Sequence, residues 1–480
     1  MKKIALFLLC VLPALLSAQS QAPTQSQSQA PPLVFTHVTV IDATGAPARP
    51  DMTVVIANDR ITELGKAGKV RIPKEAQVVD AKGKFLIPGL WDMHVHTSND
   101  DFLAMYVANG VTGVRDMFTP LERINGWRAQ IKEGKLLGPR FVAAGPIVDG
   151  PKPVWQGSIA VGNAEEGRQA VSKVKADGSD FVKVYSLLPR DAFFAIAEEA
   201  KKQGIPFAGH VPERVSAAEA SDAGQKSIEH LTGVLLACSR DEDAIRAEMD
   251  KVIAASGSSP ASRTARTAAN LKAVQSYDPA KAAALFARFK KNGTWQSPTL
   301  IVLRAVAHLN DPNFTNDPRL KYMRAPMRNF WNPQNDFRFK NRTAEDWDNA
   351  RKVYAKYLEV TGAMRKAGVE FIAGTDVSNP YCFPGFSLHD ELALLVKTGF
   401  TPMEALQAAT LNPAKYLGLL DSLGTVEKGK IANLVLLDAN PLAEIGNTQK
   451  INAVIVGGKL ITKSEIEAML AKVEAAANQK

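Results

Sequence analysis

The chain has 480 residues, of which 46% are hydrophobic and 22% are charged, and its formal net charge is +9. This composition is ordinary for a globular protein, and the length suits a barrel of roughly 250 to 400 residues with a smaller companion domain. No stretch beyond the first 20 residues is apolar enough to cross a bilayer. No run of five like charges occurs, so the net charge favours a solvated face over acidic substrates or an anionic surface as partners.

The amino-terminal residues are typical of an export signal. Two lysines precede an apolar run over residues 4–16 and then the small residues Ser17 and Ala18. This pattern predicts a signal peptide over 1–18, because the run is too short to span a membrane. Residues 19–32 are rich in Gln, Ser and Pro and predict a disordered leader. We therefore expect a periplasmic or secreted protein, in which Cys238 and Cys382 either pair or stay free.

Short alternating runs near both ends of the chain predict strands. They cover 33–84 and 423–465 and are separated by Gly, Asn and Asp turns. Strands from the two ends can close one small β-sandwich domain, which leaves 85–422 as an independent inserted domain.

Eight apolar runs in the inserted domain, most followed by helix-like or loop sequence, predict an α/β fold, a (β/α)₈ TIM-like barrel. The runs cover 85–96, 110–117, 139–145, 180–185, 206–211, 227–231, 294–300 and 370–376. Active sites of such barrels lie at the carboxyl ends of the strands. Two longer insertions, 233–293 and 310–366, are expected at the same mouth.

The first run ends in His94-Val95-His96. Residues two apart on a strand point to the same side, so the two imidazoles can bind one divalent metal such as zinc together. Other runs carry a polar residue at or near their ends, and these residues are Lys183, His210, His230 and Asp376. A closed barrel would bring all six side chains to one mouth. A buried ammonium at Lys183 needs compensation, for instance from a salt bridge to a nearby carboxylate.

The residues PGLWDMHVH resemble the motif that opens the barrel in the amidohydrolase superfamily, and KGKIANLVLLDANP resembles its closing motif, with Asn433 where relatives commonly have Asp. The resemblance implies a carbamate formed from Lys183 and CO₂ that bridges two divalent ions, with zinc the expected metal. His94, His96 and Asp376 would hold one ion, and His210 and His230 the other. Asp376 would also accept the proton of a metal-bridging hydroxide.

The resemblance is closest to prolidase-like dipeptidases and related amidases, which implies dipeptides or N-acyl amino acids as small-molecule substrates. The loop 145–158 lacks the Gly-Gly-His of many relatives, and Trp155 or Gln156 would take its place. Hydrolysis of a lactone, an aryl ester or a phosphotriester is the alternative for the same site. A catalytically inactive binding barrel is a further alternative, against which the complete ligand set speaks.

Four more side chains are weaker candidates for contacts with substrate. Tyr185 would polarise a carbonyl or simply pack, and Arg115 would meet a substrate carboxylate or form a structural ion pair. Arg304 and His308 lie one helical turn apart after the seventh strand. The aromatic and basic residues of 310–366 favour a substrate lid or a subunit interface over nucleic acid binding. No membrane span is expected, and the oligomeric state stays open, a homo-oligomer included.

Overall fold

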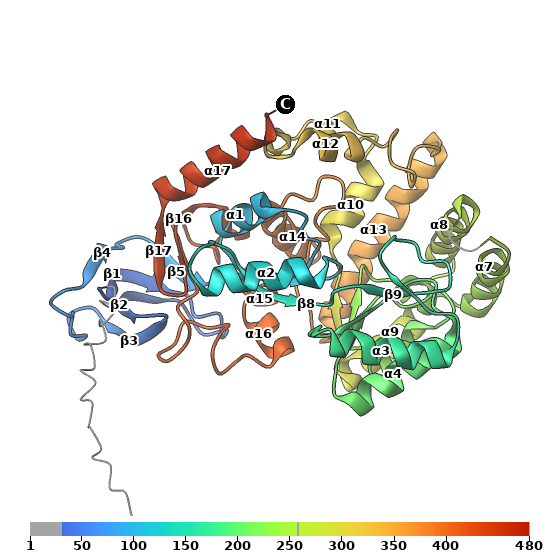
Figure 1. Ribbon diagram of the computed structural model, residues 1–480, viewed down its shortest axis with the longest axis horizontal. Coiled ribbons are helices and arrows are strands. Elements are labelled where there is room, and N and C mark those ends of the chain that lie inside the picture. Colours follow the sequence, from blue (N-terminus) through green and yellow to red (C-terminus); the bar gives the residue numbers. More distant parts are fainter. Residues whose placement is uncertain (1–30, 257–258, 480) are drawn as a thin grey trace, which may run out of the picture.

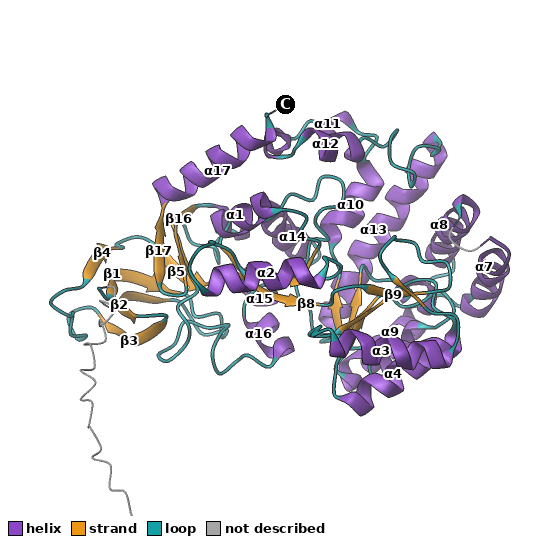
Figure 2. Ribbon diagram, viewed as in Figure 1, coloured by secondary structure: helices purple, strands orange, loops and turns teal. Residues whose placement is uncertain are grey.

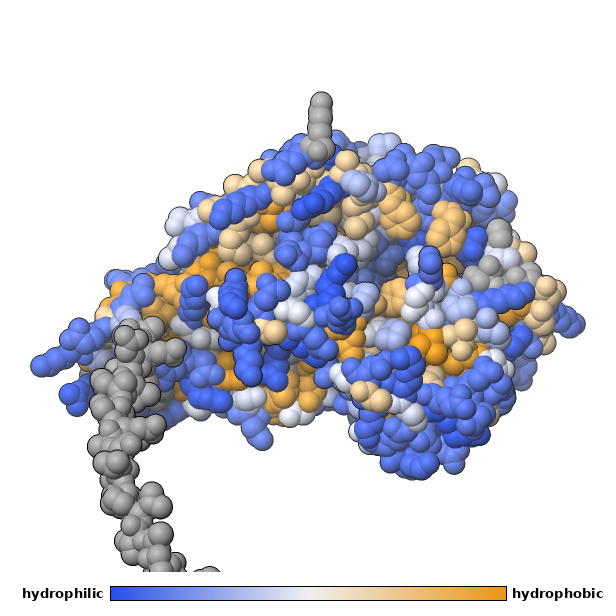
Figure 3. Space-filling view, in the orientation of Figure 1, coloured by the Kyte–Doolittle hydropathy of each residue, from blue (hydrophilic) through white to orange (hydrophobic). Residues whose placement is uncertain are grey.

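The computed structural model describes residues 31–256 and 259–479 (Figure 1). The predicted signal peptide, and the leader apart from its last two residues, lie outside these described residues. In the described part of the chain, no helix combines the length and the apolar character that crossing a membrane requires. Hydrophilic side chains cover most of the face drawn in Figure 3.

Strands from the two ends of the chain share one eight-stranded sheet, drawn in blue and red side by side in Figure 1. Its order is β17-β16-β15-β5-β1-β2-β3, and β4 pairs with β1. The strands are β1 (Leu33–Val40), β2 (Arg49–Ala57), β3 (Arg60–Lys66), β4 (Gln77–Asp80), β5 (Phe85–Pro88), β15 (Leu434–Leu437), β16 (Ile451–Val456) and β17 (Lys459–Thr462). β15 runs antiparallel to β5 and thereby joins the two ends of the chain.

The prediction that one strand covers residues 85–96 is wrong. The chain changes sheets at Gly89: β5 pairs with β15 in the terminal sheet, whereas β6 (Leu90–Val95) pairs in parallel with β7 (Val111–Asp116). The chain also continues beyond the predicted last strand into helix α17 (Lys463–Ala477). Ile466 of this helix packs with Val107 of α1 and Val454 of β16, so α17 ties the terminal sheet to the central domain.

The central domain is a TIM-barrel-like α/β domain with two parallel sheets (Figure 2). One sheet holds β6, β7 and β8 (Arg140–Ala143). The other has the order β10-β9-β11-β12-β13-β14, which are Ile159–Ala160, Ile147–Asp149, Val182–Val184, Phe207–Gly209, Ser227–Glu229 and Trp295–Ser297. Each of the first seven predicted barrel runs thus contains a strand.

The eighth predicted run, 370–376, is not a continuous strand, but its backbone bridges the two parallel sheets. The Ile372 N–H donates to the carbonyl of Gln296 in β14 (3.0 Å), and the Met93 N–H of β6 donates to the carbonyl of Ala373 (2.8 Å). Asp376 has a left-handed φ of 59°, which ends the extended conformation at the mouth.

Helices surround these sheets. Along the central domain they are α1 (Asp100–Ala108), α2 (Leu121–Lys132), α3 (Ala164–Ala176), α4 (Arg190–Gln203), α5 (Ala217–Asp222), α9 (Pro279–Asn292), α13 (Ala344–Lys366), α14 (Phe386–Lys397), α15 (Pro402–Ala408) and α16 (Leu411–Leu417). The predicted helix stop after AFFAIAEEAKKQ is present, because Gly204 caps α4 with a left-handed φ of 66°.

Helices form most of the two insertions, to which α9 and α13 also belong. The first contains α6 (Val234–Ala237), α7 (Glu242–Ser256) and α8 (Pro260–Gln275), and residues 257–258 of its expected linker lie outside the described residues. α10 (Leu300–His308) leads into the second, which contains α11 (Pro312–Thr315), the 3₁₀ helix η1 (Pro318–Tyr322) and α12 (Ala325–Trp331). A further 3₁₀ helix, η2 (Ile445–Gln449), precedes β16. Cys238 and Cys382 are buried free thiols, so the disulfide alternative is not realised.

Candidate active site

A cavity of about 240 Å³ lies at the carboxyl ends of the barrel strands. Seven of the predicted site residues line it: His94, His96, Lys183, Tyr185, His210, His230 and Asp376. The remaining lining residues are Phe118, Ile147, Trp155, Phe330, Arg338, Ser378 and Asn379. The fold therefore brings together all of the proposed metal ligands, while the predicted substrate contacts Arg115, Arg304 and His308 lie elsewhere.

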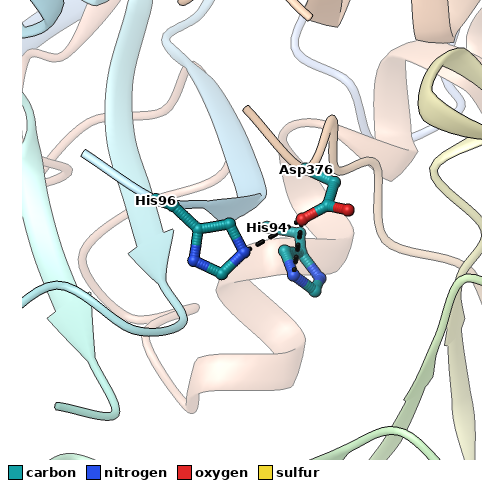
Figure 4. A group of neighbouring side chains, drawn as sticks. All are labelled: His94, His96 and Asp376. Carbon is teal, nitrogen blue, oxygen red and sulfur yellow. Dashed lines mark hydrogen bonds and ion pairs between the residues drawn. The ribbon is translucent and has the colours of Figure 1, made fainter. Parts of the chain in front are cut away.

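His94, His96 and Asp376 form a compact group whose ligand atoms lie within 4.8 Å of one another (Figure 4). Oδ1 of Asp376 is 2.9 Å from Nε2 of His96 and 3.3 Å from Nε2 of His94. Its Oδ2 is 3.7 Å from Nε2 of His230. Burial raises the pKa of the Asp376 carboxyl, but His230 and His96 outweigh it and leave this pKa below its usual value. The carboxylate is therefore ionised and can both bind a cation and accept a proton.

Three of the four histidines in the cavity are held by a hydrogen bond at Nδ1. The pairs are His94 with Glu229 (2.7 Å), His210 with Ser186 (2.9 Å) and His230 with Thr299 (2.6 Å). Burial lowers the pKa of all three imidazoles, that of His230 to about 4, so they are neutral. A neutral imidazole fixed through Nδ1 offers its Nε2 atom to a metal ion, which is the usual arrangement of a metal-binding histidine.

Lys183 is 1% exposed, and its Nζ has no hydrogen-bond partner among the described residues. No salt bridge to it is present in that part of the chain, so the simple ion-pair alternative is not realised. Burial lowers the pKa of this amine to about 8. An uncharged amine is the form that adds CO₂: its nitrogen would bond to the carbon and release a proton, which would leave an anionic carbamate at this buried position. The imidazoles, the Asp376 carboxylate and a Lys183 modified in this way would together make a donor set that suits divalent cations.

Arg115 does not line the cavity and forms the structural ion pair that the sequence left open as the alternative to a substrate contact. It is fully buried, with Nη2 2.8 Å from Oε1 of Glu229 and Nε donating to the carbonyl of Met93 (2.6 Å). Its Nη1 donates to the hydroxyls of Ser227 and Tyr416. Glu229 was missed by the sequence reasoning, although a glutamate inside the apolar run SIEHL signals a buried partner for a cation.

Asp92 is a second buried carboxyl that the sequence reasoning missed. Its oxygens accept hydrogen bonds from the Thr375 hydroxyl (2.6 Å), the Thr375 N–H (3.0 Å) and the His94 N–H (3.2 Å). Burial raises its pKa to about 7, because these hydrogen bonds only partly offset the loss of solvent. Asp92 thereby joins β6 to the bridging segment that carries Asp376.

Arg304 and His308 lie on α10, and neither lines the cavity. The prediction that they contact the substrate there is therefore wrong. Nη2 of Arg304 is 3.8 Å from Oδ2 of Asp390, and its guanidinium lies over the Phe314 ring. The His308 ring contacts the rings of Phe314 and Tyr354. Both side chains belong to the packing of the second insertion.

Tyr185 does line the cavity, and its ring stacks on His210 with a centroid distance of 3.9 Å. Its hydroxyl accepts a hydrogen bond from Nε1 of Trp155 (2.9 Å), so its own O–H is left to donate elsewhere. Burial raises the pKa of Tyr185 to about 12, which keeps the hydroxyl protonated. Trp155 comes from the loop that lacks the histidine of many relatives, while Gln156 lines an adjoining cavity.

Solved structures of several hydrolases share this fold. The bottromycin amidohydrolase has a TM-score of 0.72 and 23% identity, with 93% of this chain and 91% of that chain covered. A Xaa-Pro dipeptidase with bound methionine has a TM-score of 0.65 and 20% identity, with 90% of this chain and 100% of that chain covered. At these identities the similarity shows the fold alone.

Sequence matches to curated proteins are shorter. An N-acetylglucosamine-6-phosphate deacetylase from Caenorhabditis elegans is 36% identical over 95 residues, which is 19% of this chain and 21% of that protein. The match thus spans about a fifth of the length of this relative. The model of the family described as "Amidohydrolase family", by contrast, matches residues 85–461. Because this match runs from the start of β5 to the strands that return to the same sheet, the chain belongs to the amidohydrolase family.

Proposed function

We propose that the protein is an exported metal-dependent hydrolase that cleaves an amide bond of dipeptides or N-acyl amino acids. The observation that carries the proposal is the set of three neutral histidines whose Nδ1 atoms are occupied and whose Nε2 atoms remain for a ligand in the cavity. The related deacetylase and dipeptidase, whose names describe amide cleavage, support an amide as the substrate. The proposal includes a closed eight-stranded barrel beside a terminal β-sandwich.

The residues that would hold two divalent ions, with zinc expected, divide into two sets. His94, His96 and Asp376 would bind one ion, His210 and His230 the other, and a carbamate on Lys183 would bridge them. When bound, the two ions would lower the pKa of a bridging water and polarise the amide carbonyl.

Asp376 has the position and ionisation state of a general base. Its ionised carboxylate contacts the imidazole of His96 at 2.9 Å and lies at the edge of the cavity. It would accept the proton of the attacking water and deliver it to the leaving amine. The Tyr185 hydroxyl, protonated and held by Trp155, would donate a hydrogen bond to the substrate carbonyl.

The proposed activity is tested by incubating zinc-loaded mature protein with dipeptides, N-acyl amino acids, lactones, aryl esters and phosphotriesters. We expect amides with a free carboxylate to be hydrolysed, and the activity to disappear after chelation and dialysis and to return with zinc and bicarbonate. Cleavage of esters or phosphotriesters alone would overturn the assignment to amides. Full activity after chelation would overturn the role of the metal.

Replacing Asp376 by Asn removes the proton acceptor and keeps the shape of the side chain. We expect kcat to fall by about 10²- to 10⁴-fold, while zinc content measured by mass spectrometry is largely retained, because both ions keep their other ligands. An unchanged kcat would show that another group moves the proton. The same substitution separates an enzyme from a binding barrel, whose ligand affinity would be unaffected.

Replacing Glu229 by Gln tests the support of His94. The amide cannot neutralise Arg115, so we expect a loss of about 3 to 5 kcal/mol in the free energy of unfolding and about 10- to 100-fold weaker zinc binding. Urea unfolding and competition with a zinc chelator measure the two effects.

Glu391→Gln is the matched control. Glu391 is a buried carboxyl outside the cavity that accepts the N–H groups of Leu300 and Ile301, and burial raises its pKa to about 8. Because it is mostly protonated near pH 7, its amide should change zinc affinity little. Equal zinc affinities of the two variants would contradict the role given to Glu229.

A further inference from the structure

A second cavity, of about 450 Å³, adjoins the active-site cavity and lies between the two insertions. Its walls come from α8 of the first insertion and from residues 337–349 of the second. Four arginines line it, namely Arg263, Arg266, Arg338 and Arg342, together with Phe337 and Phe339. We call this cavity the mouth groove.

Arg338 lines both the mouth groove and the active-site cavity. Its Nε is 3.0 Å from both carboxylate oxygens of the fully buried Asp336, and its Nη2 is 2.7 Å from Oδ2. The ion pair fixes the plane of the guanidinium and turns Nη1 toward the active-site cavity. There Nη1 donates to Oδ1 of Asn379 (2.7 Å), and Nδ2 of Asn379 donates to the carbonyl of Asp376 (2.9 Å). Arg338 is thus one side chain away from the backbone of the proposed general base.

The guanidinium of Arg338 has unused hydrogen-bonding capacity. A guanidinium carries five N–H groups, and the bonds to Asp336 and Asn379 engage one N–H on each of its three nitrogens. One N–H on each Nη atom therefore has no hydrogen-bond acceptor among the described residues, while the guanidinium also lies over the rings of Trp155, Phe330 and Phe339. Two N–H groups on one guanidinium can bind a carboxylate.

The rest of the mouth groove is positively charged. Among the described residues, no carboxylate oxygen lies within 4.0 Å of the Arg263 or Arg342 guanidinium, although Arg342 donates to the carbonyl of Val306 (2.8 Å) and has Asp346 as its main opposite charge. Arg263 lies over the ring of Phe337 (5.0 Å), and Arg342 over those of Phe339 (4.9 Å) and Trp347 (4.7 Å). These rings hold the two cations in place without neutralising them.

The acidic residues near the groove offset part of its charge. Asp346, which lines the groove, accepts hydrogen bonds from the N–H and hydroxyl of Thr343 at the start of α13, and Glu213 pairs with Arg266. The bonds of Asp346 are to neutral groups, so it keeps its charge and partly offsets that of Arg342. With Glu213 bound to Arg266 and Asp336 to Arg338, the four lining arginines still outnumber the three nearby carboxylates by one. The groove is therefore suited to an anion.

We propose that Arg338 binds the free carboxylate of the substrate, and that Arg263 and Arg342 attract this anion into the mouth groove. The inference rests on the proposed function and specifies its substrate class: an amide whose amine side carries a carboxylate. It places the carboxylate contact on the second insertion. Arg338 lines the active-site cavity, whereas Arg115 and Arg304 do not. Trp155 and Phe330, which also line the active-site cavity, would cover an apolar side chain beside that carboxylate.

The test compares two probes that differ only in the carboxylate, N-acetyl-L-phenylalanine and N-acetyl-2-phenylethylamine. Their binding to zinc-loaded protein with the Asp376→Asn substitution is measured by calorimetry, so that turnover does not interfere. We expect the acid to bind about 10- to 100-fold more tightly than the neutral probe, and Arg338→Gln to remove this preference. The double variant Arg263→Gln/Arg342→Gln should lose a smaller part of the preference, and that part should shrink as salt is added.

Arg324→Gln is the matched control, because Arg324 lies in the same insertion, pairs with Asp101 at the surface and lines neither cavity. It should bind both probes as the parent protein does. Equal binding of the two probes, no binding of either, or a preference that survives Arg338→Gln would overturn the proposal. A carboxylate preference that depends on Arg338, without hydrolysis of any amide, would overturn the proposed function and leave this subsite standing.

Discussion

The site depends on the buried carboxylate of Glu229. Its Oε2 holds Nδ1 of His94 at 2.7 Å, and its Oε1 holds the guanidinium of Arg115 at 2.8 Å. The carboxylate and the guanidinium are both fully buried. Because water does not reach them, each charge is compensated by the other. Because the three residues come from β13, β6 and β7, this one interaction fixes strands on either side of the cavity relative to each other.

Two further imidazoles of the cavity are also oriented by a hydrogen bond, in their case with a neutral hydroxyl group instead of a carboxylate. Hydroxyl groups of Ser186 and Thr299 orient His210 and His230, so the scaffold sets the direction of each imidazole before any ligand arrives. Lys183 differs, because its buried nitrogen has no hydrogen-bond partner in the described part of the chain. The proposed carbamate would place an anionic group at that point.

The insertions contribute to the cavity in a different way. Phe330 and Arg338 of the second insertion reach the cavity from outside the barrel and therefore bear on which substrate enters. The barrel strands supply the proposed metal ligands, whereas the insertion supplies an aromatic ring and a guanidinium beside them. Substrate choice can thus change through the insertion while the ligand set stays the same.

What could be predicted from the sequence followed short-range rules. The two-residue period of a strand placed His94 and His96 together, and the position of strand ends in a barrel placed Lys183, His210, His230 and Asp376 beside them. The sequence left a structural ion pair open for Arg115 but could not name its partner, and it did not foresee the partner of Arg304, because Glu229 and Asp390 are more than 80 residues away and no local pattern connects them. Arg338 was missed for a related reason, since the irregular segment after α12 has no period from which its direction could be inferred. The prediction of strand boundaries was limited by distant pairing in the same way. β5 pairs with β15, some 350 residues away. The run 370–376 divides its backbone hydrogen bonds between β14 and β6.

The central claim is that two metal ions and a modified Lys183 form the catalytic centre. Anomalous X-ray diffraction from crystals of the zinc-loaded protein, grown with bicarbonate, tests it most directly. The account predicts two zinc peaks, one beside His94, His96 and Asp376 and one beside His210 and His230, with extra density on Nζ of Lys183 that touches both. A single peak beside an unmodified Lys183 would contradict it.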